Sequence, residues 1–404
     1  MMAIASASAT VGPLVGLSVV ELGDGTAGPY AAKMLGDFGA EVVKVETPDG
    51  DSSRQRGPFP DGKPDPEASG LYLYLNINKL GVSLDMRTAS GRVAIDRLLS
   101  TADIFISNLP TETLRRFDLE PPVLRERYPQ LIVTTISPFG STGPWADHKG
   151  DELVTYAMSG MAYSTPGMPD ASDDLERELP LHPAAFAAET IAGLSAATAT
   201  LAAVFGRYQT QEGCHVEVSQ QAAVASMQIR DITTASYTGE RYNRLLNPST
   251  IGRMPNFYLP CKDGYVTVAA PMVVHWERLV EAMGSPEWAH SPEYADGAAR
   301  TANWVALRLK LIDWTITLTG DELHALAEKN ELPMFPFYSI RKLAGSDQVR
   351  ERRSLVDVNI GGRQARMPGA PFSMRATPWQ LRRPAPRLGE HNDLVLSERE
   401  AAAS

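Results

Sequence analysis

The chain has 404 residues, of which 43% are hydrophobic and 21% are charged, and these near-average fractions exclude global disorder. Its formal charge of −10 comes from 38 basic and 48 acidic side chains, with no basic block, which argues against nucleic acid or an anionic membrane as the main partner. Only two cysteines occur, Cys214 and Cys261, so a disulfide framework and a cysteine-rich zinc cluster are excluded as well.

The N-terminal 20 residues are apolar but lack the charged leader of a signal peptide, so we expect them to run into a first strand. No run of 18 apolar residues is found, and no segment is predicted to span a membrane. Together with the low cysteine content, this predicts a soluble protein of the reducing cytoplasm.

The first half of the sequence alternates short β-rich runs with helical stretches. The expected strands are residues 17–21, 41–45, 82–84, 104–107 and 131–136, and the expected helices include 29–38 and 91–99. The strands are almost continuously apolar, which is typical of a parallel sheet covered by helices on both faces. The pattern therefore predicts an α/β fold.

The second half changes character. A stretch rich in Ala, Thr, Leu and Gly at residues 184–206 predicts a buried helix whose small side chains let a neighbouring helix approach closely. Residues 257–260 and 264–269 predict two antiparallel strands, and helices follow them less regularly. Prolines keep the segment 371–387 from forming a long helix, so we expect an extended tail that lies over another element.

These changes predict two domains. The large domain is expected over residues 1–225 and is completed by the C-terminal tail, residues 345–404. A smaller α+β domain is expected over residues 226–344.

A glycine-rich turn follows the first strand. Gly23, Gly25 and Gly28 fit the pattern GxGxxG, and Glu46 ends the next strand 18 residues later. This is the spacing of a dinucleotide fingerprint, in which glycines admit a pyrophosphate and an acid binds the ribose. The alternative is a turn that opens a helix, and the pattern alone leaves both open.

Ten short phrases provide a second signal. They include GDGTAGP at 23–29, GDSSR at 50–54, LYLNINKLGVSLD at 73–85, ISPFGSTGP at 136–144 and APRLGEH at 385–391. In this order they resemble the class III CoA-transferase (CaiB/BaiF) family over residues 17 to 391. Each phrase is weak alone, and the order of all ten makes the resemblance specific.

The resemblance implies a large domain with a Rossmann-like sheet that binds coenzyme A rather than NAD. It also implies that two protomers interlock, each threading through the other, as a homodimer or as a heterodimer with a homologous subunit. The substrates would be an acyl-CoA and a carboxylic acid. No metal is expected, since the histidines lack partners at ligand spacing.

In the resembled family the nucleophile is an aspartate, and the matching position here is Glu189. A carboxylate can attack a thioester to give a mixed anhydride, and the released thiolate then forms an enzyme-bound CoA thioester. The longer side chain leaves three interpretations open: a working nucleophile, a relic in a subunit whose chemistry lies elsewhere, or an acid that suits the end of a helix.

The resemblance also assigns CoA-binding positions. These are Thr26 facing the thioester, Arg54 and Lys79 near the phosphates, Asn76 and Asn78 beside Lys79, and Asn108 near the adenine or pantetheine. Cations are wanted near phosphates because charge-assisted hydrogen bonds are strong. Leu109 stands where the family has a further cation, which puts one phosphate contact in doubt.

A CoA-transferase acting through Glu189 is thus the leading hypothesis, and a non-catalytic CoA-binding subunit of a heteromeric transferase is the alternative. A 2-methylacyl-CoA racemase is disfavoured because Asp151 stands where that enzyme class has its histidine. Asp151 and Glu152 could form an acid–base pair, but exposed charges at a turn are the expected interpretation. An NAD-dependent enzyme is the least favoured.

Overall fold

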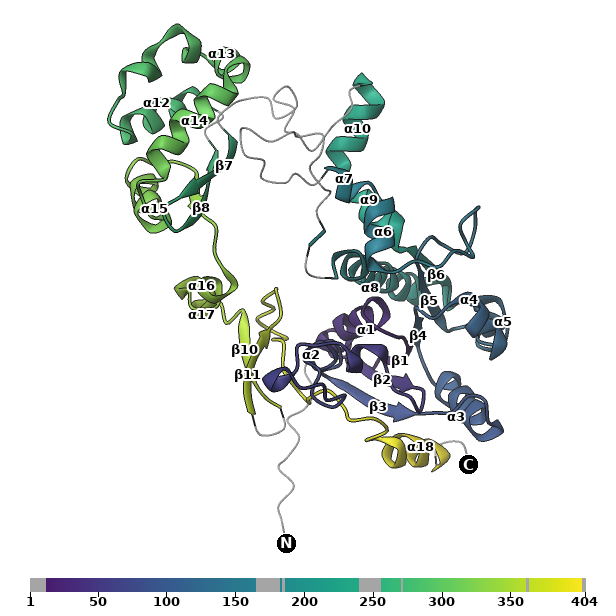
Figure 1. Ribbon diagram of the computed structural model, residues 1–404. Coiled ribbons are helices and arrows are strands. Elements are labelled where there is room, and N and C mark those ends of the chain that lie inside the picture. The colour runs from purple at the N-terminus through teal and green to yellow at the C-terminus, as the bar shows by residue number, and fades with distance from the viewer. Residues whose placement is uncertain are drawn as a thin grey trace. The chain divides into compact units, whose positions relative to one another are not determined.

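The computed structural model describes residues 12–164, 182–183, 186–239, 256–269, 272–360 and 363–401. The chain divides into two units, whose elements are labelled in Figure 1. The first unit comprises Met1–Gly160, Pro183–Met227 and Glu351–Ser404, and the second comprises Met161–His182 and Gln228–Arg350. The assignment of coenzyme A binding to the larger, first unit stays a prediction.

Six parallel strands form the sheet of the first unit. They are β1 (Ser18–Leu22), β2 (Glu41–Glu46), β3 (Lys79–Ser83), β4 (Ile104–Ser107), β5 (Ile132–Ser137) and β6 (His215–Ser219). Their order is β3-β2-β1-β4-β5-β6, and every neighbouring pair is parallel. This is the order of a doubly wound Rossmann sheet, so the predicted parallel α/β fold is confirmed.

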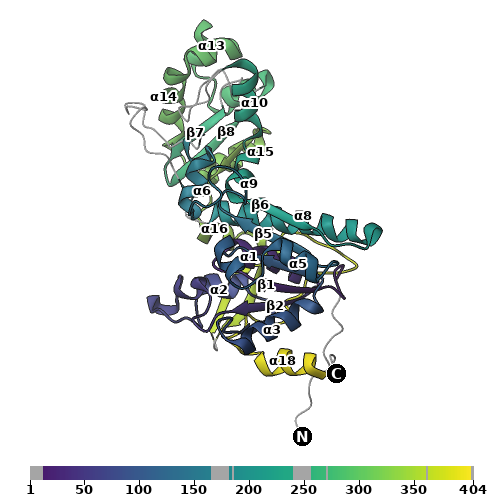
Figure 2. The same cartoon turned by 90° about the vertical axis from the view of Figure 1, so that its right-hand side faces the viewer.

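Helices cover both faces of this sheet (Figures 1 and 2). They are α1 (Ala27–Asp37), α2 (Gly70–Leu75), α3 (Ala89–Ser100), α4 (Thr111–Arg116), α5 (Pro121–Arg127), α6 (Glu152–Met158), α8 (Ala187–Thr210), α9 (Gln220–Ser226) and α18 (Asn392–Ala401), with 3-10 turns η1 (Ser52–Gln55) and η2 (Pro60–Gly62). Val19 of β1 shares a hydrophobic cluster with Ala31 of α1 and Ala196 of α8. The next residue, Val20, belongs to the opposite cluster with Ile95 of α3. This alternation is the two-residue period of a strand buried on both sides.

Helix α8 corrects one expectation. The predicted helix at 184–206 runs to Thr210, and only one face of it is buried, by residues spaced four apart such as Ala188, Ala192 and Ala196. Phe205 and Tyr208 lie on the other side and are 69% and 68% exposed. The helix is long and apolar enough to meet a simple membrane-span criterion, yet its small residues pack on α1 as those of a core helix do.

The C-terminal tail lies against the edge strand β3. Arg382 donates its backbone N–H to Asn78 Oδ1 at 2.7 Å, which holds the tail beside the start of this strand. Further on, Gly81 N donates to His391 Nδ1 at 3.1 Å and Ser83 N donates to Asn392 Oδ1 at 2.8 Å. An antiparallel hairpin, β10 (Leu355–Ile360) and β11 (Arg363–Pro368), precedes the tail.

The second unit is α+β. Its strands β7 (Asn256–Cys261), β8 (Gly264–Ala269) and β9 (Met334–Pro336) are antiparallel, and its helices are α7 (Met161–Ser164), α10 (Ile229–Thr238), α12 (Val273–Ala282), α13 (Gly297–Ala302), α14 (Trp304–Thr315), α15 (Gly320–Lys329), α16 (Ile340–Ala344) and the bridging α17 (Asp347–Glu351), with 3-10 turns η4 (Glu287–His290) and η5 (Pro292–Tyr294). The predicted pair of antiparallel strands is confirmed by the pairing of β7 with β8. Leu259, Val266, Leu279 and Leu311 are central members of the core of this unit.

Candidate active site

The order of the sheet strands reverses between β1 and β4, which makes this position in the sheet the topological switch point. In doubly wound sheets, ligands bind outside the carboxyl ends of the strands at this switch point. The loop after β1 and Asn108 after β4 meet here. Asp24 N donates to Asn108 Oδ1 at 2.8 Å, and Asn108 Nδ2 donates to the Asp24 carbonyl at 2.7 Å. The two strand ends are thus joined by a pair of hydrogen bonds.

The glycine pattern is explained by this internal contact. A Cβ atom on Gly28 would lie 2.5 Å from Asn108 Oδ1, and one on Gly23 would lie 2.9 Å from it. Gly25 has a φ of +71°, and its N–H donates to Asp51 Oδ1 at 3.2 Å. The glycines therefore let Asn108 and Asp51 hold the loop, which supports the turn interpretation over a pyrophosphate fingerprint.

A buried ion network lies under the loop. Lys44 Nζ donates to Glu21 Oε1 at 2.9 Å, to Asp51 Oδ2 at 2.7 Å and to the Gly23 carbonyl at 3.4 Å. Burial would raise the pKa of the Asp51 carboxyl, but the Lys44 ammonium and the hydrogen bonds from Ser53 together outweigh burial, and the pKa is lowered. Lys44 and Asp51 thereby connect the second strand to the backbone of the loop.

Lys79 is fully buried in the same network. Its ammonium donates to Glu21 Oε2, to the Pro29 carbonyl and to Asn76 Oδ1, each at 2.8 Å. Burial lowers the pKa of Lys79 to about 8 although Glu21 opposes this. Because an ammonium has three hydrogens, these contacts use all of them. A phosphate contact by Lys79 stays a prediction and would compete with these internal bonds.

Arg54 is similarly engaged inside the protein. It donates to both carboxylate oxygens of Glu46, at 2.7 and 2.8 Å, and to the carbonyl of Pro386 in the tail at 3.1 Å. Glu46 is the acid that a dinucleotide fingerprint would offer to a ribose, and here Arg54 and the Tyr72 hydroxyl occupy it. The phosphate contact expected of Arg54 also stays a prediction.

The paired asparagines also contact the protein. Asn76 Nδ2 donates to the Tyr72 carbonyl at 2.9 Å, and Asn78 Nδ2 donates to Asp37 Oδ1 at 3.0 Å. Asn78 has a φ of +64° and is buried. The structure thus brings Thr26, Asn108 and Glu189 to the switch point and places the other predicted residues in the supporting interior.

Glu189 lies in the first turn of α8 and is half-buried. Gly193, one turn later, packs against α1 so closely that a Cβ would lie 2.7 Å from the Ala27 carbonyl. This contact brings the start of α8 to the start of α1, where Thr26 is the N-cap residue. Glu189 Oε2 and Thr26 Oγ1 are among the buried polar atoms of the described residues that make no hydrogen bond of good geometry, and the Thr26 hydroxyl is close enough to the Glu189 carboxyl to act on its pKa.

Buried polar atoms with so little hydrogen bonding are destabilising unless they bind each other more closely or bind a ligand. The pKa of Glu189 is raised, first because the carboxyl is desolvated and further because the carboxylates of Glu152 and Asp151 repel its charge. The Thr26 hydroxyl and the Arg56 cation oppose this rise. Such atoms together with a perturbed carboxyl mark a candidate reaction centre.

Sequence reasoning missed two charged groups at this centre. Glu152 was expected to be exposed at a turn, but it is only 8% exposed, and it accepts the backbone N–H of Ala188 and of Glu189. Asp151 is exposed and caps α6 through the N–H of Val154. The burial of Glu152 depends on partners 36 and 37 residues away, which no local pattern reveals.

Arg56 is the second missed group. Its guanidinium is exposed and stacks over the ring of Phe186, 5.6 Å from the ring centre. Phe186 is the N-cap residue of α8, three positions before Glu189. The exposed cation is therefore placed beside the turn that carries the candidate nucleophile.

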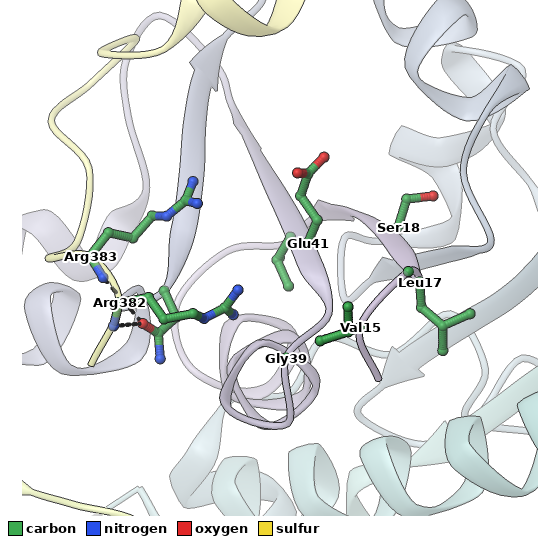
Figure 3. Close-up of a pocket in the computed structure, with 10 residues that line it drawn as sticks. Val15, Leu17, Ser18, Gly39, Glu41, Arg382 and Arg383 are labelled. Atoms are coloured by element: carbon green, nitrogen blue, oxygen red, sulfur yellow. Dashed lines mark hydrogen bonds between the residues drawn. The ribbon is translucent and has the colours of Figure 1, made fainter. Parts of the chain in front are cut away.

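Two cavities lie elsewhere in the first unit. One of about 260 Å³ is lined by Ser18 and Glu41, which begin β1 and β2, and by Arg382 and Arg383 of the tail (Figure 3). It is therefore at the amino ends of the strands, opposite the switch point. A larger one of about 970 Å³ lies between residues 60–77, the β10–β11 hairpin and the tail. Glu189 lines neither of them.

Within the described part of the chain, no three His, Cys, Asp or Glu residues form a group that could hold a metal ion. The expectation that the reaction needs no metal stays a prediction.

Comparisons with known proteins agree with this geometry. The family model described as CoA-transferase family III matches residues 14–392, and the chain belongs to this family. It is 31% identical to a succinate–glutarate CoA-transferase from Agrobacterium fabrum, over 96% of each chain. It is also 31% identical to a succinyl-CoA:mesaconate CoA-transferase from Haloarcula hispanica, again over 96% of each.

A solved structure is similar over the same extent. The crystal structure of a CaiB/BaiF family protein from Brucella suis has a TM-score of 0.86 and 27% sequence identity, and the match covers 96% of this chain and all of that one. The predicted family is thus confirmed, and with it the predicted class of fold. Membership of this family argues against the alternative hypothesis of an NAD-dependent enzyme.

Proposed function

We propose that this chain transfers coenzyme A between an acyl-CoA and a carboxylic acid through covalent intermediates on Glu189. The observation that carries the proposal is the buried Glu189 carboxyl, with a raised pKa, beside the Thr26 hydroxyl at the switch point of a sheet in this family. The carboxylate supplies a nucleophile, and the hydroxyl can donate a hydrogen bond to it or to the substrate carbonyl.

Four steps complete the transfer. A Glu189 carboxylate oxygen attacks the thioester carbon, the C–S bond breaks, and CoA thiolate leaves a mixed anhydride behind. The thiolate attacks the glutamyl carbon, which releases the donor acid and forms a glutamyl-CoA thioester. The acceptor carboxylate then displaces the thiolate, and the thiolate finally attacks the acceptor acyl carbon. The Glu189 carboxylate returns, and no net proton is consumed.

Asn108 and the loop it holds would form the wall nearest the bound coenzyme. Arg54, Asn76, Asn78 and Lys79 would support that wall from inside, through their bonds to Glu46, Tyr72, Asp37 and Glu21. A direct phosphate contact by Arg54 or Lys79 would require an internal bond to open.

Trapping tests the proposal. The wild-type chain is incubated with succinyl-CoA, treated with hydroxylamine or borohydride, digested and mapped by mass spectrometry. We expect modification confined to the peptide that holds Glu189. Modification of another acidic residue, or transfer of CoA with no trapped intermediate, would contradict the role of Glu189.

A non-catalytic subunit is the second candidate. Two relatives, each 29% identical, are named as the alpha and beta subunits of a succinyl-CoA–L-malate CoA-transferase from Chloroflexus aurantiacus. We infer that this chain interlocks with a second copy or with a homologous chain, supported by the exposed Phe205 and Tyr208 on α8. Activity that needs a homologous partner and survives Glu189→Gln would favour this candidate.

A cytoplasmic location stays a prediction.

Arg56 is proposed to bind the second carboxylate of a dicarboxylic substrate, since succinate, glutarate and mesaconate occur in the names of relatives. Its planar guanidinium suits a carboxylate, and no described residue forms an ion pair with it. Arg56→Gln should lower kcat/KM for succinyl-CoA by roughly 10- to 100-fold and change that for butyryl-CoA little.

Steady-state assays with the two donors check this prediction, and Arg56→Lys should recover part of the loss. Arg87→Gln is the matched control, because Arg87 is also exposed but pairs with Asp85 instead. An equal loss with both donors would contradict a role in reading the second carboxylate.

A further inference from the structure

A carboxylate from another helix holds the turn that carries Glu189. Ala188 N donates to Glu152 Oε1 at 3.0 Å, and Glu189 N donates to Glu152 Oε2 at 2.8 Å. A helix begins with four N–H groups that lack partners inside the helix, and Glu152 satisfies two of them at once. The N-cap residue Phe186 makes no capping hydrogen bond through its side chain. The cap of α8 is therefore supplied across the fold by α6.

The same contact fixes the position of the nucleophile. The bond to the N–H of Glu189 restrains the backbone of that residue from the α6 side. Gly193 restrains the next turn from the other side, through its close approach to the Ala27 carbonyl. The carboxylate of Glu189 thus projects from a turn held by two elements. Such support matters because a displacement of about 1 Å can lower a rate by on the order of 10²-fold.

Glu152 also changes the electrostatics of the turn. The N-terminus of a helix carries partial positive charge, which stabilises a nearby carboxylate and lowers its basicity. Glu152 occupies this end with a negative charge of its own. Asp151 adds to its repulsion, and Arg56 and Thr26 act in the opposite direction. A more basic anion is a better nucleophile, as is established for thiolates.

We propose that Glu152 is a positioning residue for CoA transfer, which fixes the first turn of α8 and prevents the helix terminus from stabilising the Glu189 carboxylate. The proposal rests on the nucleophilic role of Glu189 proposed above. Glu152 does not touch the reacting atoms, and it acts through the backbone and the charge of Glu189.

Two variants distinguish the effect of the length of the Glu152 side chain from the effect of its charge. Glu152→Gln keeps the length but loses the charge and turns an amide hydrogen toward one backbone N–H. We expect kcat to fall by roughly 10- to 100-fold and the acid limb of kcat/KM to move to lower pH, because the pKa of Glu189 falls. Glu152→Asp keeps the charge but is one methylene short. Its kcat should fall as well, with the acid limb close to that of the wild type.

Thr88→Ala is the matched control, because Thr88 caps helix α3 through the N–H of Gly91, away from the switch point. It removes a helix cap and should leave both the rate and the pH profile unchanged. A Glu152→Gln variant that loses thermal stability as Thr88→Ala does, and keeps the wild-type acid limb, would overturn the proposal.

A titration without turnover keeps the two proposals apart. The carboxyl of Glu189 is followed by ¹³C NMR in selectively labelled protein, and its signal is assigned by its loss in Glu189→Gln. The midpoint should fall in Glu152→Gln whether or not the chain transfers CoA alone. An unchanged midpoint would refute the electrostatic role of Glu152, whereas a wild type that is never labelled at Glu189 would refute the proposed function.

Discussion

Replacing Glu189 by glutamine should abolish CoA transfer while the fold persists. The amide has nearly the same size, but it cannot attack the thioester, so we expect kcat to fall by roughly 10⁴- to 10⁶-fold, the range seen when a nucleophile or its partner is removed. The measurement is CoA transfer from succinyl-CoA, read by separation of the acyl-CoA products. Glu189→Asp is the informative companion, because it restores the shorter acid that the resembled family carries.

Stability provides the control for that experiment. The pKa of Glu189 is raised by burial and by neighbouring carboxylates, so the folded protein loses stability as the pH rises through this value and the carboxyl ionises. Glutamine cannot ionise, and the variant should be at least as stable as the wild type at pH 7. Loss of activity together with a lower unfolding midpoint would indicate misfolding. Full activity of Glu189→Gln in the isolated chain would exclude Glu189 as nucleophile.

Replacing Lys44 by methionine should produce a large loss of stability. The methionine fills similar space but leaves Asp51 buried without its cation, while Glu21 keeps its ion pair with Lys79. Removing one partner of a buried ion pair typically costs about 3–5 kcal/mol, because the remaining charge is neither paired nor hydrated. Urea unfolding at pH 7, followed by circular dichroism, measures the change.

The effect of Lys44→Met should shrink in acid. In the wild type, the lowered pKa of Asp51 contributes stability above the ordinary pKa of an aspartate, and this contribution is lost as the pH falls through the lowered value. The variant lacks this contribution at every pH, so the two unfolding midpoints should converge only when the pH falls below the ordinary pKa of an aspartate, through the lowered pKa of Asp51. Arg87→Met, which breaks an exposed pair with Asp85, is the control and should leave the midpoint almost unchanged. An equal loss of stability in Lys44→Met and Arg87→Met would contradict the view that burial makes the Lys44 ion pairs important.

Local patterns in the sequence predicted the sheet well. Strands β2 and β4 begin at the expected residues, and β1 and β5 are displaced by one residue. Apolar runs that are buried on both faces are specified by their own composition. Strand β3 was expected at 82–84 and instead begins at Lys79, since a lysine is a poor signal for a buried strand. Its burial depends on Glu21, 58 residues earlier in the chain.

The site was less predictable for the same reason. The position of Glu189 follows from the family resemblance, but the atoms around it come from distant segments. Arg56, which follows η1, and Glu152 of α6 act on its pKa, and no local sequence pattern indicates that they do. The phosphate contact of Lys79 stays a prediction, but its bond to Glu21 could not be foreseen, because the two residues are 58 positions apart in the sequence. Residue types and their spacing in the sequence indicate which side chains could take part in the site. The contacts between those side chains depend on the tertiary fold.

The tail along β3 has a consequence for biosynthesis. Among the described residues, His391 and Asn392 bond to the outer edge of strand β3, and the carbonyl of Pro386 is one of the acceptors of Arg54. His391 and Asn392 follow their partners in the strand that they complete by 310 and 309 positions in the sequence, so they are made long after it. The sheet is therefore expected to mature only after residues 386–392 have been made, and a chain truncated near residue 380 should expose an open edge that promotes aggregation.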